Sequence, residues 1–205
     1  MNVHDALKEL RKEDKRKFDQ SVDLVINLRG IDLKRESINT IVNLPHVVKE
    51  KKVCGFFMKN SGLVDSIPEP EFQKYKDKKA LKKLAKEYDY FIAAASLMPK
   101  VATIFGKVLG PMGKMPSPQL GILMDEKDEA VAETLEKINH SLKIRVKEAS
   151  VKMSVGKESM GDGILEQNIV AVYHSIVNAL PKKIENIRSV MIKFSMTKAI
   201  KVGVV

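Results

Sequence analysis

The sequence FGKVLGPMGKMPSP, residues 105–118, is the stretch from which the fold of the chain is inferred. Each proline removes a backbone donor and restricts the residue before it, so a helix is not expected to continue through Gly110-Pro111 and a further proline soon after. The stretch also carries Lys107 and Lys114, with no acidic residue between them. These features predict a rigid, basic turn.

A glycine-rich basic turn raises the question of a phosphate-binding loop, whose pattern is Gly, four residues, Gly-Lys and then Ser or Thr. The pattern fails here. If Gly113-Lys114 were its end, the first glycine would have to stand at Val108, and Met115 follows the lysine. A structural or nucleic-acid-facing loop is therefore favoured over nucleotide hydrolysis.

The composition favours an anionic partner. The 205 residues include 36 Lys+Arg and 26 Asp+Glu, a net charge of +10, and nucleic acid is the usual partner of such a chain. Residues 141–205 hold 11 basic and 5 acidic residues, which leaves +6 of that excess in the last third.

The single cysteine, Cys54, lies in an apolar run and predicts a buried thiol in a reducing compartment. No signal peptide and no apolar run near 18 residues stands out, so a cytoplasmic protein without a membrane segment is expected.

Hydrophobic spacing outlines the elements of the chain. Alternating apolar residues predict strands at 21–28 and 38–44, and continuous apolar runs predict buried strands at 53–58 and 89–95. Three- and four-residue spacing predicts helices at 5–17, at 79–88, from Pro99 onward, and from a cap at Asp125 to His140. The alternation of strands and helices in 53–140 is typical of a small open α/β domain.

The last third begins with two alternating segments, 142–147 and 151–155, which are expected to form strands joined by a tight turn at Glu148–Ala149. A helix is predicted from Gly163 to Leu180, capped by Asp162, and two strands follow at 189–196 and 199–205. The first 49 residues supply strands without the helices to cover them. We therefore expect one α+β domain from residues 1–49 and 141–205, with residues 50–140 inserted as a second, α/β domain.

Catalytic and metal-binding chemistry finds little support. The four histidines lie in different predicted elements, without HExxH or paired-cysteine spacing, so no metal, no cofactor and no catalytic residue is predicted. The acidic run that begins at Asp125 is explained by the positive end of a helix dipole. A nucleotide-binding enzyme that uses the inserted domain stays as an alternative on fold analogy alone.

Nucleic-acid binding is better supported. The two strands after Ser141 project basic side chains on one face, and the final strands add others; the set is Lys143, Arg145, Lys147, Lys152, Lys157, Arg188, Lys193, Lys198 and Lys201. Phe18 and Met196 offer apolar surfaces to bases. An ordinary solvated sheet face remains the alternative interpretation. The absence of Trp argues against a base-stacking single-strand platform.

Several motifs in one order resemble a known family. LGPMGKMP, residues 109–116, is similar to the LGPRGKMP signature of the L-one family of large-ribosomal-subunit proteins. The other matching segments are Lys17–Asp23 with Asn27-Leu28, Asn43–His46, Tyr88–Ala93, Leu97–Pro99, Val155–Met160, Asn186–Val190 and Ser195-Met196. The resemblance covers nearly the whole chain. The residues of the matching motifs are closer to archaeal or eukaryotic members than to bacterial ones.

The resemblance implies a discontinuous α+β sandwich domain from both termini and an inserted Rossmann-like three-layer α/β domain. It implies a non-enzymatic protein, monomeric when free, that binds large-subunit rRNA at the base of the mobile stalk. The protein would also assist release of exit-site tRNA and repress translation of its own mRNA. A non-ribosomal RNA-binding repressor of the same fold is a further alternative.

The resemblance also assigns RNA-binding residues, which lie in the domain built from both termini. With the basic strand residues they are Lys17, Phe18, Ser21, Asp23, Lys143, Arg145, Gly156, Lys157, Ser195, Met196 and Thr197. Gly110, Gly113 and Lys114 are expected to face tRNA or stalk RNA. Shape recognition is the expected mode, in which hydroxyls, amides and a carboxylate read ribose and base edges while lysines contact phosphates.

Four departures from the family pattern stand in this sequence, and one of them is a short stretch after Phe57, which is expected to reduce or remove a helix of the inserted domain. Thr197-Lys198 replaces a usual Gly-Pro, which affects the close approach of the backbone at that turn. Val47-Val48 replaces glycines of the linker, and Met112 replaces an arginine of the loop. Relative to the family pattern, we expect these changes to alter RNA affinity and the hinge motion at the linker.

Overall fold

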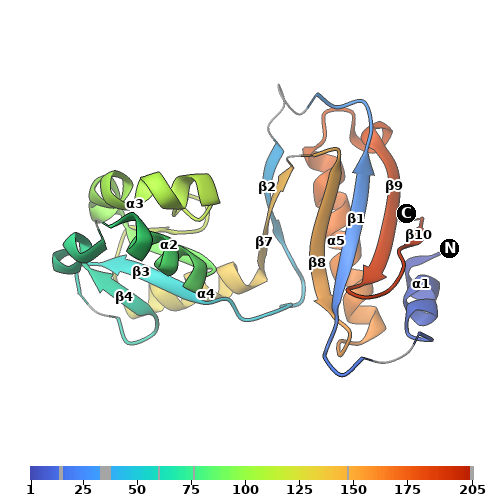
Figure 1. Cartoon of the computed structure of the whole chain (residues 1–205), viewed down its shortest axis with the longest axis horizontal. Coiled ribbons are helices and arrows are strands. Elements are labelled where there is room, and N and C mark those ends of the chain that lie inside the picture. Colours follow the sequence, from blue (N-terminus) through green and yellow to red (C-terminus); the bar gives the residue numbers. More distant parts are fainter. Residues whose placement is uncertain (14–15, 33–37, 60, 76, 147, 204–205) are drawn as a thin grey trace. The chain divides into compact units, whose positions relative to one another are not determined.

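The computed structural model describes residues 1–13, 16–32, 38–59, 61–75, 77–146 and 148–203. Within them the chain forms two compact units, one built from Met1–Lys49 and His140–Val205 and the other from Glu50–Asn139 (Figure 1). Each unit is described by itself. The expectations for residues 14–15, for Lys147 and for the end of the last strand at 204–205 lie outside the described residues.

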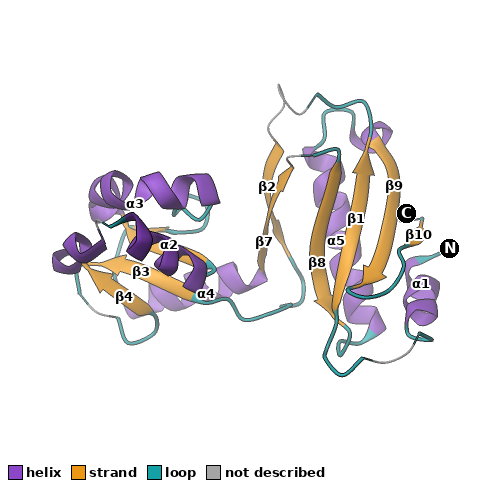
Figure 2. Cartoon of the chain, in the orientation of Figure 1, coloured by secondary structure: helices purple, strands orange, loops and turns teal. Residues whose placement is uncertain are grey.

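The two-ended unit is organised on a four-stranded antiparallel sheet of order β10-β9-β1-β8 (Figure 2). Its strands are β1 (Ser21–Leu28), β8 (Ser150–Lys157), β9 (Ile187–Phe194) and β10 (Ile200–Val202). Alternation decides the faces of β1, because Val22, Leu24 and Ile26 are fully buried while Asp23 and Asn27 are only half-buried. The strands predicted at 21–28 and in the last third are thus confirmed.

One face of this sheet is covered by helices. Helix α5 (Asp162–Ala179) buries the predicted stripe, which includes Leu165, Ile169, Val172 and Ile176. Helix α1 (Val3–Leu10) contributes Ala6, Leu7 and Leu10 to the same core, and it is shorter than the predicted 5–17. The other face carries no described helix, as Figure 1 shows with α5 behind the strands.

A separate two-stranded sheet pairs β2 (Ile38–Asn43) with β7 (Ser141–Val146). The two strands expected after Ser141 form close together in the chain, but they do not belong to one sheet, because β7 pairs with β2 and β8 pairs with β1. Each strand finds its partner among the first 43 residues instead of in its chain neighbour. A basic face shared by both strands therefore does not form.

The inserted unit contains a four-stranded parallel sheet of order β4-β3-β5-β6. Its elements are β3 (Val53–Phe57), β4 (Asp65–Pro68), η1 (Glu69–Tyr75), α2 (Lys78–Glu87), β5 (Tyr90–Ala94), η2 (Ala95–Leu97), α3 (Met98–Met112), β6 (Ile122–Leu123) and α4 (Asp128–His140). Every residue of β3 is buried, as expected for a strand covered on both faces. The strands β4 and β6 and the turn η1 were not predicted, because they are short or lie among loop-forming residues.

Four phenylalanines form the core of this unit. Phe56 stacks on Phe91 with 5.6 Å between ring centroids and meets Phe72 edge-on at 5.7 Å, while Phe105 lies 4.6 Å from Phe56. Aromatic pairs at such separations add to the stabilisation from buried area. Cys54 is fully buried beside them, and burial raises the pKa of its thiol to about 12. The predicted buried thiol is confirmed.

The prediction of a turn throughout residues 105–118 is wrong for its first half. Helix α3 continues through Gly110-Pro111 and ends at Met112. The proline is tolerated because only Met112 follows it in the helix, so little of the helix is disturbed, and because Gly110 has no Cβ to clash with the ring. Gly113, with φ +70°, then stops the helix: its N–H bonds to Gly110 O at 3.0 Å and the Lys114 N–H bonds to Leu109 O at 3.0 Å.

Two predicted caps are also wrong. Helix α4 begins at Asp128, so Asp125 lies outside it. Asp162 is the first residue of α5 instead of its cap, a position held by Gly161. An acidic residue in the first turn still stabilises the positive end of a helix without a capping bond, which is why the sequence pattern looks the same in both cases.

Among the described residues, no helix is long and apolar enough to cross a membrane.

Candidate nucleic-acid interface

One edge of the four-stranded sheet gathers residues from both ends of the chain. Strand β1 begins there, and its neighbours β8 and β9 end there, with Ser21 opposite Lys157 and Val22 opposite both Gly156 and Phe194. Most of the RNA-binding residues expected from the resemblance therefore lie together. We call this region the edge site, defined as residues 16–21, 156–160 and 194–197.

Serine pairing joins the start of β1 to the turn after β9. The Ser21 N–H donates to Ser195 Oγ at 3.2 Å, and the Ser195 N–H donates to Ser21 O at 3.1 Å. The turn itself is closed by Thr197, whose Oγ1 accepts from the Phe194 N–H at 2.9 Å. Lys183 is the one described non-glycine residue with positive φ, so Thr197 adopts an ordinary turn without needing the glycine of the family pattern.

A buried glutamine connects all three segments of the edge site. Gln20 is 2% exposed, and its Oε1 accepts from the Met196 N–H at 3.1 Å while its Nε2 donates to Glu158 Oε2 at 3.1 Å. Its backbone carbonyl accepts from the Glu158 N–H at 2.7 Å. These bonds fix the backbone on which Met196 is presented.

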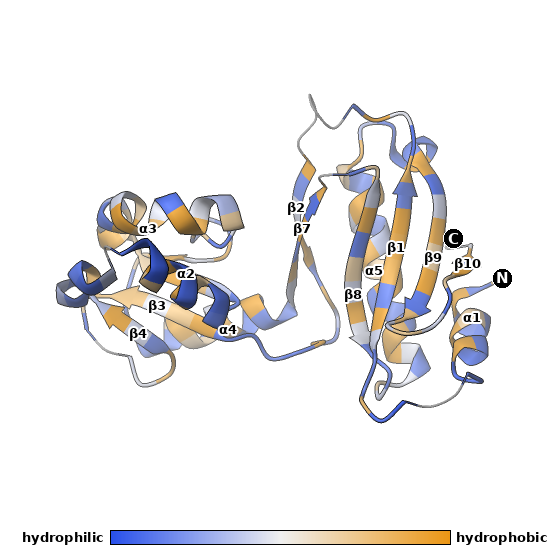
Figure 3. Ribbon diagram, in the orientation of Figure 1, coloured by the Kyte–Doolittle hydropathy of each residue, from blue (hydrophilic) through white to orange (hydrophobic). Residues whose placement is uncertain are grey.

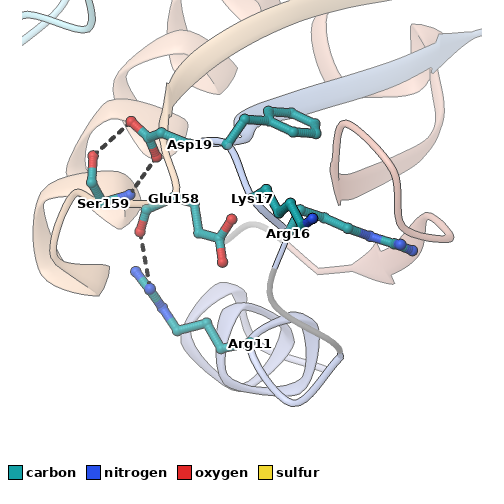
Figure 4. A pocket seen from close by; sticks show the side chains of 7 residues that line it. Arg11, Arg16, Lys17, Asp19, Glu158 and Ser159 are labelled. Carbon is teal, nitrogen blue, oxygen red and sulfur yellow. Dashed lines mark hydrogen bonds between the residues drawn. The ribbon is translucent and has the colours of Figure 1, made fainter.

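A shallow pocket of about 500 Å³ opens beside these contacts and is lined by Arg11, Arg16, Lys17, Phe18, Asp19, Glu158 and Ser159 (Figure 4). Asp19 receives the Ser159 N–H at 3.0 Å and the Ser159 hydroxyl at 2.9 Å. Arg11 donates to Glu158 O at 3.0 Å, to Met160 O at 2.7 Å and to Asp162 Oδ1 at 2.7 Å. The walls of the pocket are thus held by partly buried bonds of Arg11 and by exposed bonds of Asp19.

Two apolar side chains project from this ordered backbone into solvent. Phe18 is 54% exposed and Met196 is 61% exposed. Exposed apolar side chains on an otherwise polar, hydrogen-bonded rim can pack against nucleobases, while Lys17 and Lys157 supply positive charge beside them. The edge site therefore combines apolar contact, hydrogen-bonding groups and charge within one surface.

Gly156 is required by the core beneath the edge site. A Cβ at this position would lie 2.2 Å from Leu165 Cδ2 and 3.4 Å from Met160 Sδ. Leu165 is fully buried on α5, so the contact would displace a packed core side chain. The glycine expected from the resemblance to approach RNA thus has a packing reason as well.

The uncovered face of the sheet continues from the edge site. Asp23 lies opposite Ser154 on β8 and Lys193 on β9. Burial raises the pKa of the Asp23 carboxyl, and the nearby Lys193 charge lowers it in part. Farther along β1, the Asn27 amide donates to Ser189 Oγ at 2.9 Å. The side chains named on this face are polar, and Figure 3 shows hydrophilic residues along β1, β8 and β9.

Lys143 and Arg145 belong to a different surface. Both lie on β7, opposite Ile41 and Asn39 of the two-stranded sheet. Burial lowers the pKa of Lys143, and the charge of Arg145 lowers it further. The structure therefore does not bring these two predicted residues onto the sheet that carries the edge site.

The three residues expected in the loop also have structural roles in the inserted unit. Gly110 is helical, Gly113 ends α3, and the Lys114 ammonium donates to Ala85 O at 2.8 Å and to Tyr88 O at 2.7 Å. These carbonyls lie at the C-terminal end of α2, where a cation complements the helix dipole. Lys114 thus binds its own protein with two of its three donors.

We expect Lys114→Met to lower the free energy of unfolding by about 1–2 kcal/mol, because two charge-assisted hydrogen bonds to helix carbonyls are lost. Thermal unfolding followed by circular dichroism measures the change. Lys107→Met, at an exposed position on α3, is the control and should change stability by no more than about 0.5 kcal/mol. Equal effects of the two variants would contradict the capping role.

Sequence reasoning missed the residues that hold the edge site in shape, namely Gln20, Asp19 and Arg11. Nothing in the local pattern separates Gln20 from a surface glutamine, since its burial depends on partners at Glu158 and Met196. Arg11 lies at the end of α1 within a charged run, and its three acceptors are far along the chain. The available signal was that Asp19 and Gln20 lie inside the segment Lys17–Asp23, which resembles the family.

Gln20→Ala is expected to lower stability by about 1–2 kcal/mol, because the Met196 N–H and the Glu158 carboxylate lose a buried partner. Denaturant unfolding measures that loss. Gln20→Glu, which keeps the acceptor for Met196 but places a carboxylate beside Glu158, should be at least as destabilising. An unchanged midpoint in both variants would contradict the connecting role.

The sequence matches the profile described as the Ribosomal protein L1p/L10e family over residues 10–198, and the chain belongs to this family. The resemblance inferred from the motifs is thereby confirmed. The members to which it is similar are ribosomal proteins and not enzymes, so the nucleotide-binding enzyme is excluded.

Similar proteins named "Large ribosomal subunit protein uL1" come from archaea. That of Thermofilum pendens is 35% identical, with 98% of this chain and 93% of its own length covered. That of Nanoarchaeum equitans is 33% identical over 97% of this chain and 98% of its own length. The protein from Korarchaeum cryptofilum is 36% identical over 95% of this chain and 92% of its own length.

Proposed function

We propose that the chain is a structural constituent of the large ribosomal subunit in the cytoplasm and binds its rRNA at the mobile stalk through the edge site. The observation that carries this proposal is the convergence of Ser21, Lys157 and Ser195 from three distant segments, beside the exposed Phe18 and Met196. A surface already held by its own hydrogen bonds before RNA arrives loses little entropy on binding. Such a surface is suited to shape recognition.

Three finer functions go with this proposal. The protein assists release of tRNA from the exit site, other ribosomal components are its neighbours, and it represses translation of its own mRNA where that message folds like the rRNA target. The same edge site would serve both RNAs, because recognition of shape does not require an identical sequence. A free monomer is the form that binds.

The test compares the affinity of the full chain for an RNA three-way junction of the stalk type with its affinity for a plain RNA duplex at equal salt. We expect the junction to bind about 10³-fold more tightly or better, as specific nucleic-acid binders do. Equal affinities would contradict specific recognition. Co-sedimentation with large ribosomal subunits then separates a ribosomal protein from a free repressor of the same fold, which would stay in the supernatant.

A further inference from the structure

The inserted unit separates its charges between two helices. Helix α2 has the sequence KKALKKLAKE, and its five lysines are all exposed, with Glu87 as its one acidic residue. Helix α4 and the residues before it carry instead Asp125, Glu126, Asp128, Glu129, Glu133 and Glu136. The small net charge of the unit therefore hides a basic side and an acidic side. Figure 3 shows α2 as a strongly hydrophilic helix.

The two helices lie on opposite faces of the parallel sheet. The connections β4–α2–β5 and β5–α3–β6 advance across the sheet in the same direction, and right-handed crossovers then place α2 and α3 on one face. Strand β3 is buried on both faces, so α4 must cover the other one. Figure 1 shows this arrangement, with α2 in front of β3 and α4 behind it.

The lysines of α2 repel one another in the free protein. Lys78 and Lys82, Lys79 and Lys83, and Lys82 and Lys86 are each four residues apart, a spacing at which like charges destabilise a helix. No described residue forms an ion pair with any of these five lysines, whereas Lys74, Lys100, Lys127 and Lys137 of the same unit each have an acidic partner. An anionic partner from outside would relieve this repulsion.

A groove adjoins the basic helix. It has a volume of about 330 Å³ and is lined by Lys78 and Leu81 of α2 and by Thr103, Ile104, Lys107 and Val108 of α3. Its floor is apolar and its rim bears two exposed lysines. This combination suits a nucleotide, whose base packs on apolar side chains while its phosphate meets the ammonium groups.

We propose that the surface formed by α2 and the adjoining groove of α3 is a second RNA-binding surface, which contacts the phosphate backbone without reading sequence. The proposal rests on the proposed function in one respect, that the chain acts while bound to RNA. The acidic side of the unit repels the same backbone, so the charge separation also sets which face the unit presents to RNA. Charge supplies the affinity here, whereas the edge site supplies the selectivity.

A tethered cleavage experiment locates this surface directly. Cys54 is buried with a pKa raised to about 12, so an iron-chelate probe attaches only to a cysteine introduced on the surface. We expect the probe on Lys83→Cys to cleave bound stalk RNA and the probe on Lys137→Cys, on the acidic helix, to leave it intact. Equal cleavage from both positions, or none from position 83, would overturn the proposal.

The salt dependence of binding gives a second, independent readout. Replacing Lys79, Lys82, Lys83 and Lys86 by glutamine keeps helix propensity and should flatten the slope of log affinity against log salt by about 1 for each lysine that contacts phosphate. The thermal midpoint should rise at the same time, because the repulsion is removed. Lys127→Gln with Lys137→Gln is the matched control and should leave the slope unchanged.

Two measurements separate this inference from the proposed function: the preference of the wild type for the junction over the duplex, and the salt slope of the α2 variant. Loss of slope in the α2 variant with no junction preference in the wild type supports the second surface alone. A retained junction preference with an unchanged slope supports the edge site alone and overturns the second surface.

Discussion

Asn168→Ala is expected to lower the free energy of unfolding of the two-ended unit by about 3 kcal/mol. Asn168 is fully buried on α5, and its amide donates to His46 O at 3.1 Å and to Val155 O at 3.0 Å. Its Oδ1 accepts from the His46 N–H at 3.1 Å. The substitution leaves one buried and two partly buried backbone groups without this partner, each at a cost of about 1–3 kcal/mol when unsatisfied, less what water recovers.

Native-state hydrogen exchange of the amides of β8 and α5 measures this effect in the unit concerned, because a chain of two units need not unfold in one step. Gln167→Ala is the matched control: its side chain also contacts His46, with 2.7 Å between Gln167 Oε1 and His46 Nε2, but at the surface. The control should cost no more than about 0.5 kcal/mol. Equal losses of protection in both variants would contradict the role of Asn168.

Phe18→Ala and Met196→Ala are expected to weaken binding of the stalk-type RNA junction by about tenfold each or more, in line with about 1–3 kcal/mol for each base that loses its apolar partner. Both side chains are more than half exposed, so neither change should alter the stability of the free protein by more than about 0.5 kcal/mol. The preference for the junction over a duplex should fall as well, since both residues act on bases.

Calorimetric titration or filter binding at two salt concentrations measures this loss. The slope against salt should stay as in the wild type, because neither residue carries charge, and this separates the pair from the lysines of the edge site. Met124→Ala removes an equally apolar, 89% exposed side chain in the inserted unit and serves as the control. Unchanged affinity in both edge-site variants would exclude apolar contact there.

Elements whose apolar pattern is local could be predicted from the sequence. The alternation in β1, the continuous apolar run of β3 and the stripe of α5 each reflect burial by neighbours on a known face, and each is confirmed. It was harder to predict from the sequence which strands pair with one another. The pairing of β7 with β2 joins residues about 100 positions apart, and nothing within β7 distinguishes that partner from its chain neighbour β8.

The candidate site shows the same limit. The motifs around Phe18, Gly156 and Ser195 identify segments, and the structure brings these segments together at one sheet edge. Gln20 and Asn168 are buried polar residues that hold these segments in place through hydrogen bonds to other parts of the chain. From composition alone, both look like surface residues. The bonds of Lys114 to its own chain were missed as well, because the pattern of a basic residue in a glycine-rich turn does not reveal the helix carbonyls that it binds.

The division of the chain between the two units also orders events during synthesis. The inserted unit, Glu50–Asn139, is continuous in sequence, so all its strands are available to pair before the rest of the chain is made. The edge site is different, because Ser21 must wait for Lys157 and then for Ser195. On the proposed function, a nascent chain would therefore not recognise RNA until its last strands emerge, and control of its own message would be exerted only by finished protein.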